Sequence, residues 1–174
     1  MTEIRPLESS DSVAVEHFLQ RVPEGDRTFF KEDVTDPGVL AAWTRPGGGR
    51  SIAVEGDSVL GYVAVVPLTG WSSHVGEVRV IVDPDHRGRG IGRALARHAV
   101  LQALELGITK MVVEVVADQE PAIAMFRSLG FDPEALLKDH VRDQAGELRD
   151  LMILAHVAEE AYAAMATAGL AESV

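Results

Sequence analysis

Val80-Ile-Val-Asp-Pro-Asp-His-Arg-Gly-Arg-Gly-Ile-Gly-Arg-Ala-Leu95 is the stretch that decides the fold, because it joins a β-branched run to a helical pattern through a glycine cluster. The first backbone N–H groups of a helix have no intrahelical acceptor, and the helix dipole adds partial positive charge there. Glycine leaves such amides open to a phosphate, since no Cβ stands in the way. The segment Arg87–Gly92 therefore predicts an anion-binding loop.

The spacing of the glycines narrows the kind of anion. Gly88, Gly90 and Gly92 supply no G-x-G-x-x-G register, and Gly92 is followed by Arg-Ala where a P-loop needs Lys and then Ser or Thr. Basic residues gather here within thirteen positions, namely His86, Arg87, Arg89, Arg93, Arg97 and His98. Such a local cluster in a chain of net charge −11 predicts a small anionic ligand, and the alternative is a solvated helix face without a ligand.

The composition indicates one domain and excludes several functions. The 174 residues are 47% hydrophobic and 25% charged, and the absence of cysteine rules out disulfides, thiolate zinc sites and a cysteine nucleophile. The excess of acidic over basic residues, 27 against 16, disfavours a nucleic-acid partner. The N-terminal stretch lacks the apolar segment of a signal peptide, and no apolar run approaches the roughly 18 residues of a membrane span. We therefore expect a cytoplasmic protein with no membrane partner.

Hydrophobic periodicity and turn residues predict a mixed α/β domain. Strands are expected over Glu3–Leu7, Ser51–Glu55, Val59–Val66, Val75–Asp83, Lys110–Val116, Phe131–Arg142 and Glu147–Ala155. Helices are expected from about Ser9 to Arg21, in a second region ending at Trp43, over Gly90–Leu106 and over Gln119–Leu129, with a helical tail over about 157–170. The first helix is expected to break at Pro23–Asp26, and the second helical region to be interrupted at Asp36-Pro37-Gly38.

Two motifs in this order resemble the signatures of the GNAT superfamily of acyltransferases. Arg87-x-x-Gly90-x-Gly92 is similar to its Arg/Gln-x-x-Gly-x-Gly loop, and Ala122–Phe131 is similar to its second signature, a short helix that ends in Leu-Gly-Phe. The resemblance implies a single GNAT domain over residues 1–174. It also implies a mixed sheet of six to seven strands flanked by about four helices, in which Val75–Asp83 and Lys110–Val116 splay apart around the cofactor.

The resemblance further implies acetyl-CoA as the cofactor and no metal. Backbone groups of Val80 and Val82 would hold the pantetheine arm, and the loop amides, with Arg93, would hold the pyrophosphate. Gln119 takes the place of an Asn that contacts the cofactor in many members. The residues expected at the cofactor are Val80, Val82, Arg87, Gly88, Arg89, Gly90, Ile91, Gly92, Arg93, Gln119 and Phe126.

The chemistry implied by the family is direct attack of an amine on the thioester, which needs a base, an oxyanion stabiliser and an acid for the thiolate. Glu77 is the first candidate base, since its strand resembles that of bacterial protein-lysine acetyltransferases, and Glu114 is the second, since Val-Val-Glu-Val resembles a strand of ribosomal-protein alanine acetyltransferases. The alternative for Glu77 is a surface carboxylate or a partner for Arg79. His74 is a third, weaker candidate.

Phe126 departs from the family, because many members carry a Tyr there as the acid for the thiolate. An acyl-CoA sensor without catalysis is therefore the alternative to an N-acetyltransferase, and a nucleotide-binding protein of another kind is a third interpretation. The acceptor would be a primary amine on a small molecule or a protein, and the acidic composition favours a cationic one. Trp71, His74 and His140 are the residues expected on the acceptor side, and a homodimer is possible.

Overall fold

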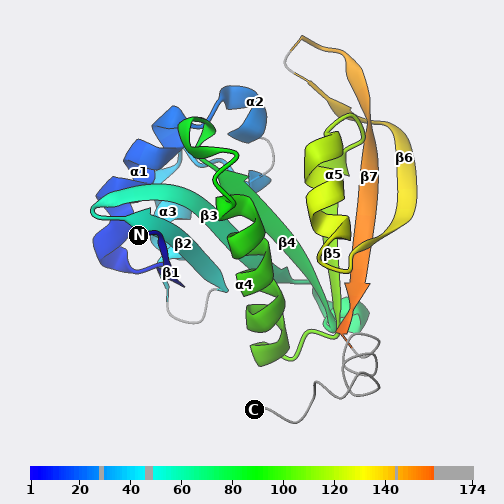
Figure 1. The fold of residues 1–174 in the computed structure, drawn as a ribbon, viewed down its shortest axis with the longest axis horizontal. Helices are drawn as coiled ribbons and strands as arrows, with labels where there is room; N and C mark the ends of the chain where they lie inside the picture. The colour runs from blue at the N-terminus through cyan, green and yellow to red at the C-terminus, as the bar shows by residue number, and fades with distance from the viewer. Residues whose placement is uncertain (28–29, 46–48, 144, 159–174) are drawn as a thin grey trace.

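A seven-stranded sheet in the order β1-β2-β3-β4-β5-β7-β6 forms the centre of the computed structural model (Figure 1), which describes residues 1–27, 30–45, 49–143 and 145–158. The strands are β1 (Glu3–Pro6), β2 (Arg50–Glu55), β3 (Ser58–Pro67), β4 (Val75–Val82), β5 (Lys110–Val116), β6 (Asp132–Arg142) and β7 (Leu148–Val157). The α-helices are α1 (Ser12–Arg21), α2 (Glu24–Arg27), α3 (Pro37–Trp43), α4 (Ile91–Glu105) and α5 (Glu120–Arg127). Short 3₁₀ turns are η1 (Ser9–Asp11), η3 (Gly70–Ser72) and η4 (Pro84–His86). The predicted mixed α/β fold is confirmed.

The two halves of the sheet meet only through a short parallel contact between β4 and β5. Three residue pairs join them, from Val75 opposite Lys110 to Glu77 opposite Val112. Beyond these pairs β4 stays bound to β3 as far as Val82, whereas β5 stays bound to β7 along its whole length. The predicted splaying of these two strands is therefore confirmed, and Figure 1 shows them diverging toward the upper edge of the sheet.

Side chains from the two faces of the sheet pack into two separate hydrophobic cores. Val63 and Val65 of β3 pack with Leu95 of α4, in a cluster that also contains Phe126 from α5. Tyr62, on the opposite face of β3, packs with residues of α1 and α3. A strand buried on both faces reads as a continuous apolar run, which is why β3 and β5 were predictable from their composition.

Helix α4 follows the glycine loop, and its limits are set by two glycines. Gly90 is its N-cap, and Gly107 follows its last turn with a φ of 72°. The Gly107 amide donates to the Leu104 carbonyl at 3.0 Å, and the Ile108 amide donates to the Ala103 carbonyl at 2.9 Å. This is the Schellman pattern of hydrogen bonds, and it confirms the predicted C-terminal glycine.

Predicted boundaries near the N-terminus were right in one place and wrong in two. Helix α1 starts at Ser12 and not at about Ser9, because Ser9–Asp11 form a 3₁₀ turn that is capped by Glu8. The break at Pro23–Asp26 is confirmed, since α1 ends at Arg21, although Glu24–Arg27 then forms a separate helical turn. Asp36-Pro37 starts a helix instead of interrupting one, since the Asp36 carboxylate accepts from the Gly38 amide at 2.8 Å and proline suits the first helical position.

The C-terminal end of the sheet also differs from expectation. Strand β7 continues to Val157, where the sequence predicted the start of a helix, because Val157 pairs with Lys110 of the adjacent β5. The rest of the predicted helical tail, from residue 159, lies outside the described residues. No helix in the described ranges is long and apolar enough to cross a membrane.

Gly61 is predicted to be essential to the packing of α4 on β3. An added Cβ would lie 2.8 Å from Leu95 Cδ1 and 3.1 Å from the Ile81 carbonyl oxygen. We expect Gly61→Ala to lower the free energy of unfolding by about 1 to 3 kcal/mol, the usual effect of overpacking. Gly25→Ala is the control, since a Cβ there meets no atom within 4 Å, and it should be neutral or stabilising. Urea unfolding of both variants checks this, and equal stabilities would contradict it.

Candidate active site

The glycine loop presents open backbone at the start of α4. Gly88 and Gly90 have φ values of 76° and 81°, a region that favours glycine, and an added Cβ at either would meet no protein atom within 4 Å. The helix begins at Ile91, so the amides of Ile91, Gly92 and Arg93 have no carbonyl one turn earlier in the helix. The backbone conformation of the two glycines and the free space beside them both fit the predicted anion site.

A buried aspartate that sequence reasoning did not single out holds this loop in place. Asp83 is completely buried at the end of β4, where its carboxylate accepts from Arg21 Nε at 2.6 Å and from the Asp85 amide at 3.1 Å. Burial is the largest influence on the Asp83 pKa and would raise it, but these hydrogen bonds and the Arg21 charge outweigh burial and hold the pKa below its ordinary value. Arg21 also donates to the Val59 carbonyl at 2.8 Å, so α1, β3 and the loop are tied together.

The arginines of the loop are bound to protein partners in this structure. Arg87 pairs with Asp26 of α2, and Arg89 pairs with Glu55 of β2 at 3.1 Å. Arg93 donates to the Ser128 hydroxyl at 3.0 Å, just beyond α5. The capacity of the loop to bind an anion therefore rests first on its backbone amides.

A free strand edge adjoins the loop. Val80 and Val82 lie on β4 beyond its last pair with β5, and their partly buried side chains pack against the core beneath α4 and α5. An added Cβ at Gly92 would lie 3.4 Å from Val82 Cγ2 and 3.5 Å from Met125 Sδ, so the loop, β4 and α5 converge at Gly92. Unpaired backbone groups inside a protein need a partner, and an extended ligand arm lying along this edge would supply one.

Two further predicted cofactor residues lie on or beside α5. Gln119 is the N-cap of this helix, and its carbonyl accepts from the amides of Ala122 and Ile123 at 3.0 and 3.1 Å. Phe126 is only 4% exposed, and its ring packs edge-to-face on Phe131 with centroids 5.3 Å apart. Phe126 is therefore part of the apolar core beside α4 and has no proton to donate.

The two candidate bases meet at the fork between β4 and β5. Glu77 is the last β4 residue paired with β5, opposite Val112, and Glu114 lies two residues further along β5. Paired residues on adjacent strands point to the same face, so Glu77 and Val112 share a face of the sheet. Side chains two residues apart on a strand also share a face, so Glu114 projects from the same face as Val112 and Glu77. Lys31 joins them, since its Nζ lies 2.9 Å from Glu77 Oε1 and 2.7 Å from Glu114 Oε2. The sequence contains no motif that marks Lys31.

Glu77 is the more buried and the more strongly paired of the two. Its side chain is 12% exposed and that of Glu114 is 30% exposed. Arg79 Nε donates to Glu77 Oε1 at 3.1 Å, so the predicted alternative of an Arg79 partner is also realised. Burial, the largest influence, would raise the Glu77 pKa, but hydrogen bonds from Arg79 and Lys31 hold the pKa below its ordinary value of 4.5.

The residues predicted for the acceptor side are not gathered at this fork. Trp71 is 97% exposed on η3, and His74 is exposed three residues before Glu77, where its carbonyl accepts from the Thr109 and Lys110 amides. His140 is exposed on β6, the outermost strand. No hydrogen bond or ion pair found among the described residues links these three side chains to either carboxylate.

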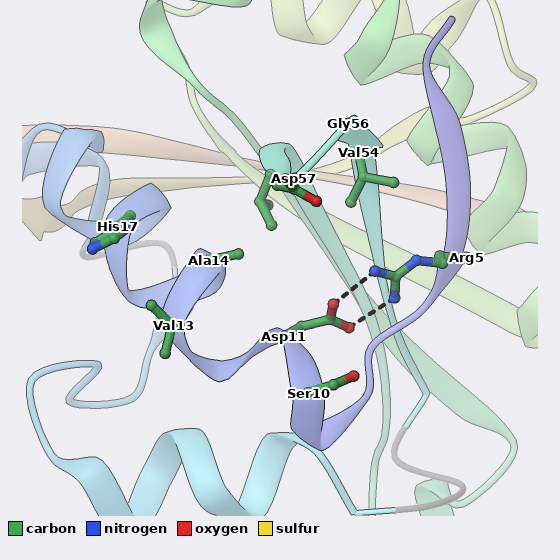
Figure 2. A pocket seen from close by; sticks show the side chains of 10 residues that line it. Arg5, Ser10, Asp11, Val13, Ala14, His17, Val54, Gly56 and Asp57 are labelled. Atoms are coloured by element: carbon green, nitrogen blue, oxygen red, sulfur yellow. Dashed lines mark hydrogen bonds and ion pairs between the residues drawn. The ribbon is translucent and has the colours of Figure 1, made fainter.

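Figure 2 shows a hollow elsewhere on the molecule, lined by residues of β1, η1, α1 and the β2–β3 hairpin. Its charged centre is the ion pair of Arg5 with Asp11, with two N–O distances of 2.7 and 2.6 Å. None of the described residues that line it belongs to the predicted site. The pair joins β1 to the start of α1, so we interpret this hollow as structural.

Comparison with known proteins agrees with this geometry. The model of the acetyltransferase (GNAT) family matches residues 14–131. Streptothricin acetyltransferase of Streptomyces lavendulae is 31% identical over 121 residues, which are 62% of this chain and 64% of that protein. The ribosomal protein bS18-alanine N-acetyltransferase of Escherichia coli (strain K12) is 33% identical over 76 residues, 44% of this chain and 51% of that protein. The chain thus spans between about half and two thirds of these relatives.

Among solved structures, yncA from Salmonella typhimurium, determined with its cofactor acetyl-CoA, superimposes with a TM-score of 0.76. The alignment covers 91% of this chain and 95% of that one at 22% sequence identity. At this identity the likeness concerns the fold.

The lowered pKa of Glu77 predicts a pH-dependent contribution to stability. A carboxylate whose folded pKa lies below its unfolded value stabilises the protein fully above the unfolded value, and that contribution is lost as the pH falls through the folded pKa. We expect Glu77→Gln to cost about 1 to 2 kcal/mol at pH 7, and the cost to shrink below about pH 4.5. Urea unfolding between pH 7 and 3 checks this, with Glu16→Gln on the exposed side of α1 as the control. A cost that stays constant to pH 3 would contradict it.

Proposed function

The chain belongs to the GNAT acetyltransferase family, and we propose that it is an N-acetyltransferase that moves the acetyl group of acetyl-CoA to a primary amine by direct attack in a ternary complex. One observation carries the proposal, namely the placement of three features along the separated part of β4. The two carboxylates lie at the fork, the unpaired edge of β4 runs from the fork to Val82, and the open glycine loop follows that edge. They correspond to a proton acceptor, a pantetheine site and a pyrophosphate site.

The described residues fit acetyl-CoA as the bound group. The amides from Gly88 to Arg93 would hold the pyrophosphate, because Gly88 and Gly90 leave space for it. Backbone groups of Val80 and Val82 would hold the pantetheine arm along the free edge of β4, and Gln119 would contact it from α5. The bound group supplies an activated thioester, and a β4 amide at the fork would stabilise negative charge on its oxygen.

Glu77 and Glu114 are the two candidate bases for the acceptor ammonium. Glu114 is the more exposed and Glu77 the more tightly held, with a lowered pKa that keeps it ionised. A carboxylate pair at one point of the cleft can hold an ammonium with one member while the other member, directly or through water, accepts its proton. A phenylalanine at position 126 leaves the thiolate to depart without help from that position.

The acceptor that this site favours is a cationic primary amine. Two carboxylates face the fork, and the whole chain carries a net charge of −11, which attracts cations. The matched relatives are named for a small-molecule acceptor in one case and for a ribosomal protein in the other, so both classes belong in a screen. Trp71, His74 and His140 stay predictions for the acceptor side, as do the homodimer and the cytoplasmic location.

Gly90→Ala should weaken acetyl-CoA binding. A variant with the same backbone strain outside the loop should not. Gly146→Ala is the matched control, since Gly146 has a φ of 83° against 81° for Gly90 and neither Cβ would meet an atom within 4 Å. We expect the dissociation constant of Gly90→Ala to rise at least about tenfold, equivalent to about 1.4 kcal/mol. Calorimetric titration measures both variants. Equal affinities would remove the loop from the site.

Replacing the carboxylates should separate their roles. We expect the variant that lacks the base, Glu77→Gln or Glu114→Gln, to lose about 10²- to 10⁴-fold in kcat/KM. The variant that lacks only an ammonium contact should mainly raise the KM for the amine. Thiol release over a panel of small amines and peptides is the measurement, with Glu16→Gln as the control. Full activity in both variants would refute the base assignment, and acetyl-CoA binding without thiol release for any amine would favour the sensor.

A further inference from the structure

Lys31 places its ammonium group between the two carboxylates at the fork. Its Nζ bridges the two candidate bases at 2.9 and 2.7 Å, although it comes from the segment between α2 and α3 and from neither strand. We propose that Lys31 holds its ammonium group in the place of the acceptor, and that Lys31 is therefore an acetylation site of this chain. The inference rests on the proposed function, because it takes the fork as the point of acyl transfer.

The residues on both sides of Lys31 are firmly held, so its position is a consequence of the fold. The Phe30 ring lies 5.4 Å from the rings of both Trp43 and Tyr62, and the Phe30 carbonyl accepts from Arg79 Nη1 at 2.6 Å. On the other side, Glu32 accepts from Trp43 Nε1 at 2.8 Å.

The backbone of Lys31 itself is in an uncommon conformation. Its φ is 58°, and in the described residues only Lys31 and Asp139 among non-glycine residues have a positive φ. Such a conformation is strained for a residue with a side chain and persists only where surrounding contacts impose it. The two ion pairs of Nζ and the anchors at Phe30 and Glu32 are those contacts.

The arrangement suits a primary alkylammonium. Two carboxylates that face one another repel unless a cation lies between them, and Lys31 Nζ supplies that cation through its two ion pairs. A protonated primary amine on an unbranched chain has the same charge and the same N–H donors as the Lys31 side chain. Arg79 binds Glu77 as well, but a guanidinium stays protonated and does not act as a nucleophile.

The step proposed for Lys31 balances as follows. A carboxylate at the fork takes one proton from the Lys31 ammonium, and the neutral nitrogen attacks the thioester carbonyl carbon. The C–N bond forms, the C–S bond breaks, and the nitrogen loses a second proton to give the neutral amide. The thiolate of coenzyme A takes one proton, so one proton in all is released to solvent. No oxidant, reductant or metal is needed.

The first test uses the other lysines as internal controls. The chain contains three lysines, Lys31, Lys110 and Lys138, and Lys110 is exposed enough to report uncatalysed acetylation, since its side chain is 30% exposed and paired with Glu134. After incubation of the full chain with acetyl-CoA and no amine, we expect a mass increase of one acetyl group. Peptide mapping should place it at Lys31, acetylated at least about 10²-fold faster than Lys110 or Lys138.

The second test needs no acetyl-CoA. Lys31→Met removes the internal ammonium, so butylamine hydrochloride should bind this variant about tenfold more tightly than the wild type, which must first displace Lys31. Lys31→Arg keeps a cation at the fork and should bind butylamine no better than the wild type does. Calorimetric titration measures all three proteins. Equal affinity of Lys31→Met and the wild type would overturn the proposed position of Lys31.

Failure of this inference can be told apart from failure of the proposed function. The acetylation test is run beside the amine panel on the same protein. Transfer to an external amine together with equal acetylation of all three lysines overturns Lys31 as an acetylation site and leaves the enzyme intact. Absence of transfer both to every external amine and to Lys31 overturns the proposed function and, with it, acetylation of Lys31. Butylamine binding then still decides whether Lys31 fills an ammonium site.

Discussion

The early end of the parallel pairing between β4 and β5 is the constraint on which the rest of the structure depends. Each strand is bound to another neighbour, β4 to β3 and β5 to β7, so the two can separate after three residue pairs without loss of either half-sheet. Separation leaves one edge of β4 without a strand partner in the interior. Unsatisfied backbone groups are costly where water is excluded, which is why we propose this edge as the place of an extended ligand arm.

The fork also explains why charged side chains can stand in an otherwise apolar sheet. Glu77 and Glu114 would be expensive to bury alone, but they share Lys31, and Glu77 also has Arg79. The same cations keep the Glu77 pKa low in spite of its burial. The Lys31 ion pairs, the Lys31 backbone conformation and the aromatic packing of the adjacent Phe30 therefore depend on one another. A ligand that displaces the Lys31 ammonium must supply a positive charge in its place.

Much of the fold could be predicted from local patterns, and the failures have physical causes. The β-branched runs of β3, β4 and β5 and the glycine that ends α4 acted as expected. Asp36-Pro37 was wrongly predicted to interrupt a helix, because a proline reads as a breaker unless the preceding residue is known to cap the helix. Strand β7 extended into the predicted tail because pairing with β5 overrode local helical preference.

The sequence by itself determined the family, the glycine loop and both candidate carboxylates, since each depends on residue type and spacing within one short segment. Only the tertiary structure decided what these residues contact. It brought Lys31 onto Glu77 and Glu114, placed Asp83 beneath the loop with Arg21, and bound Arg87 and Arg89 to acids on other elements. These contacts join positions far apart in the chain, and no local pattern encodes them, because they arise from how the elements pack.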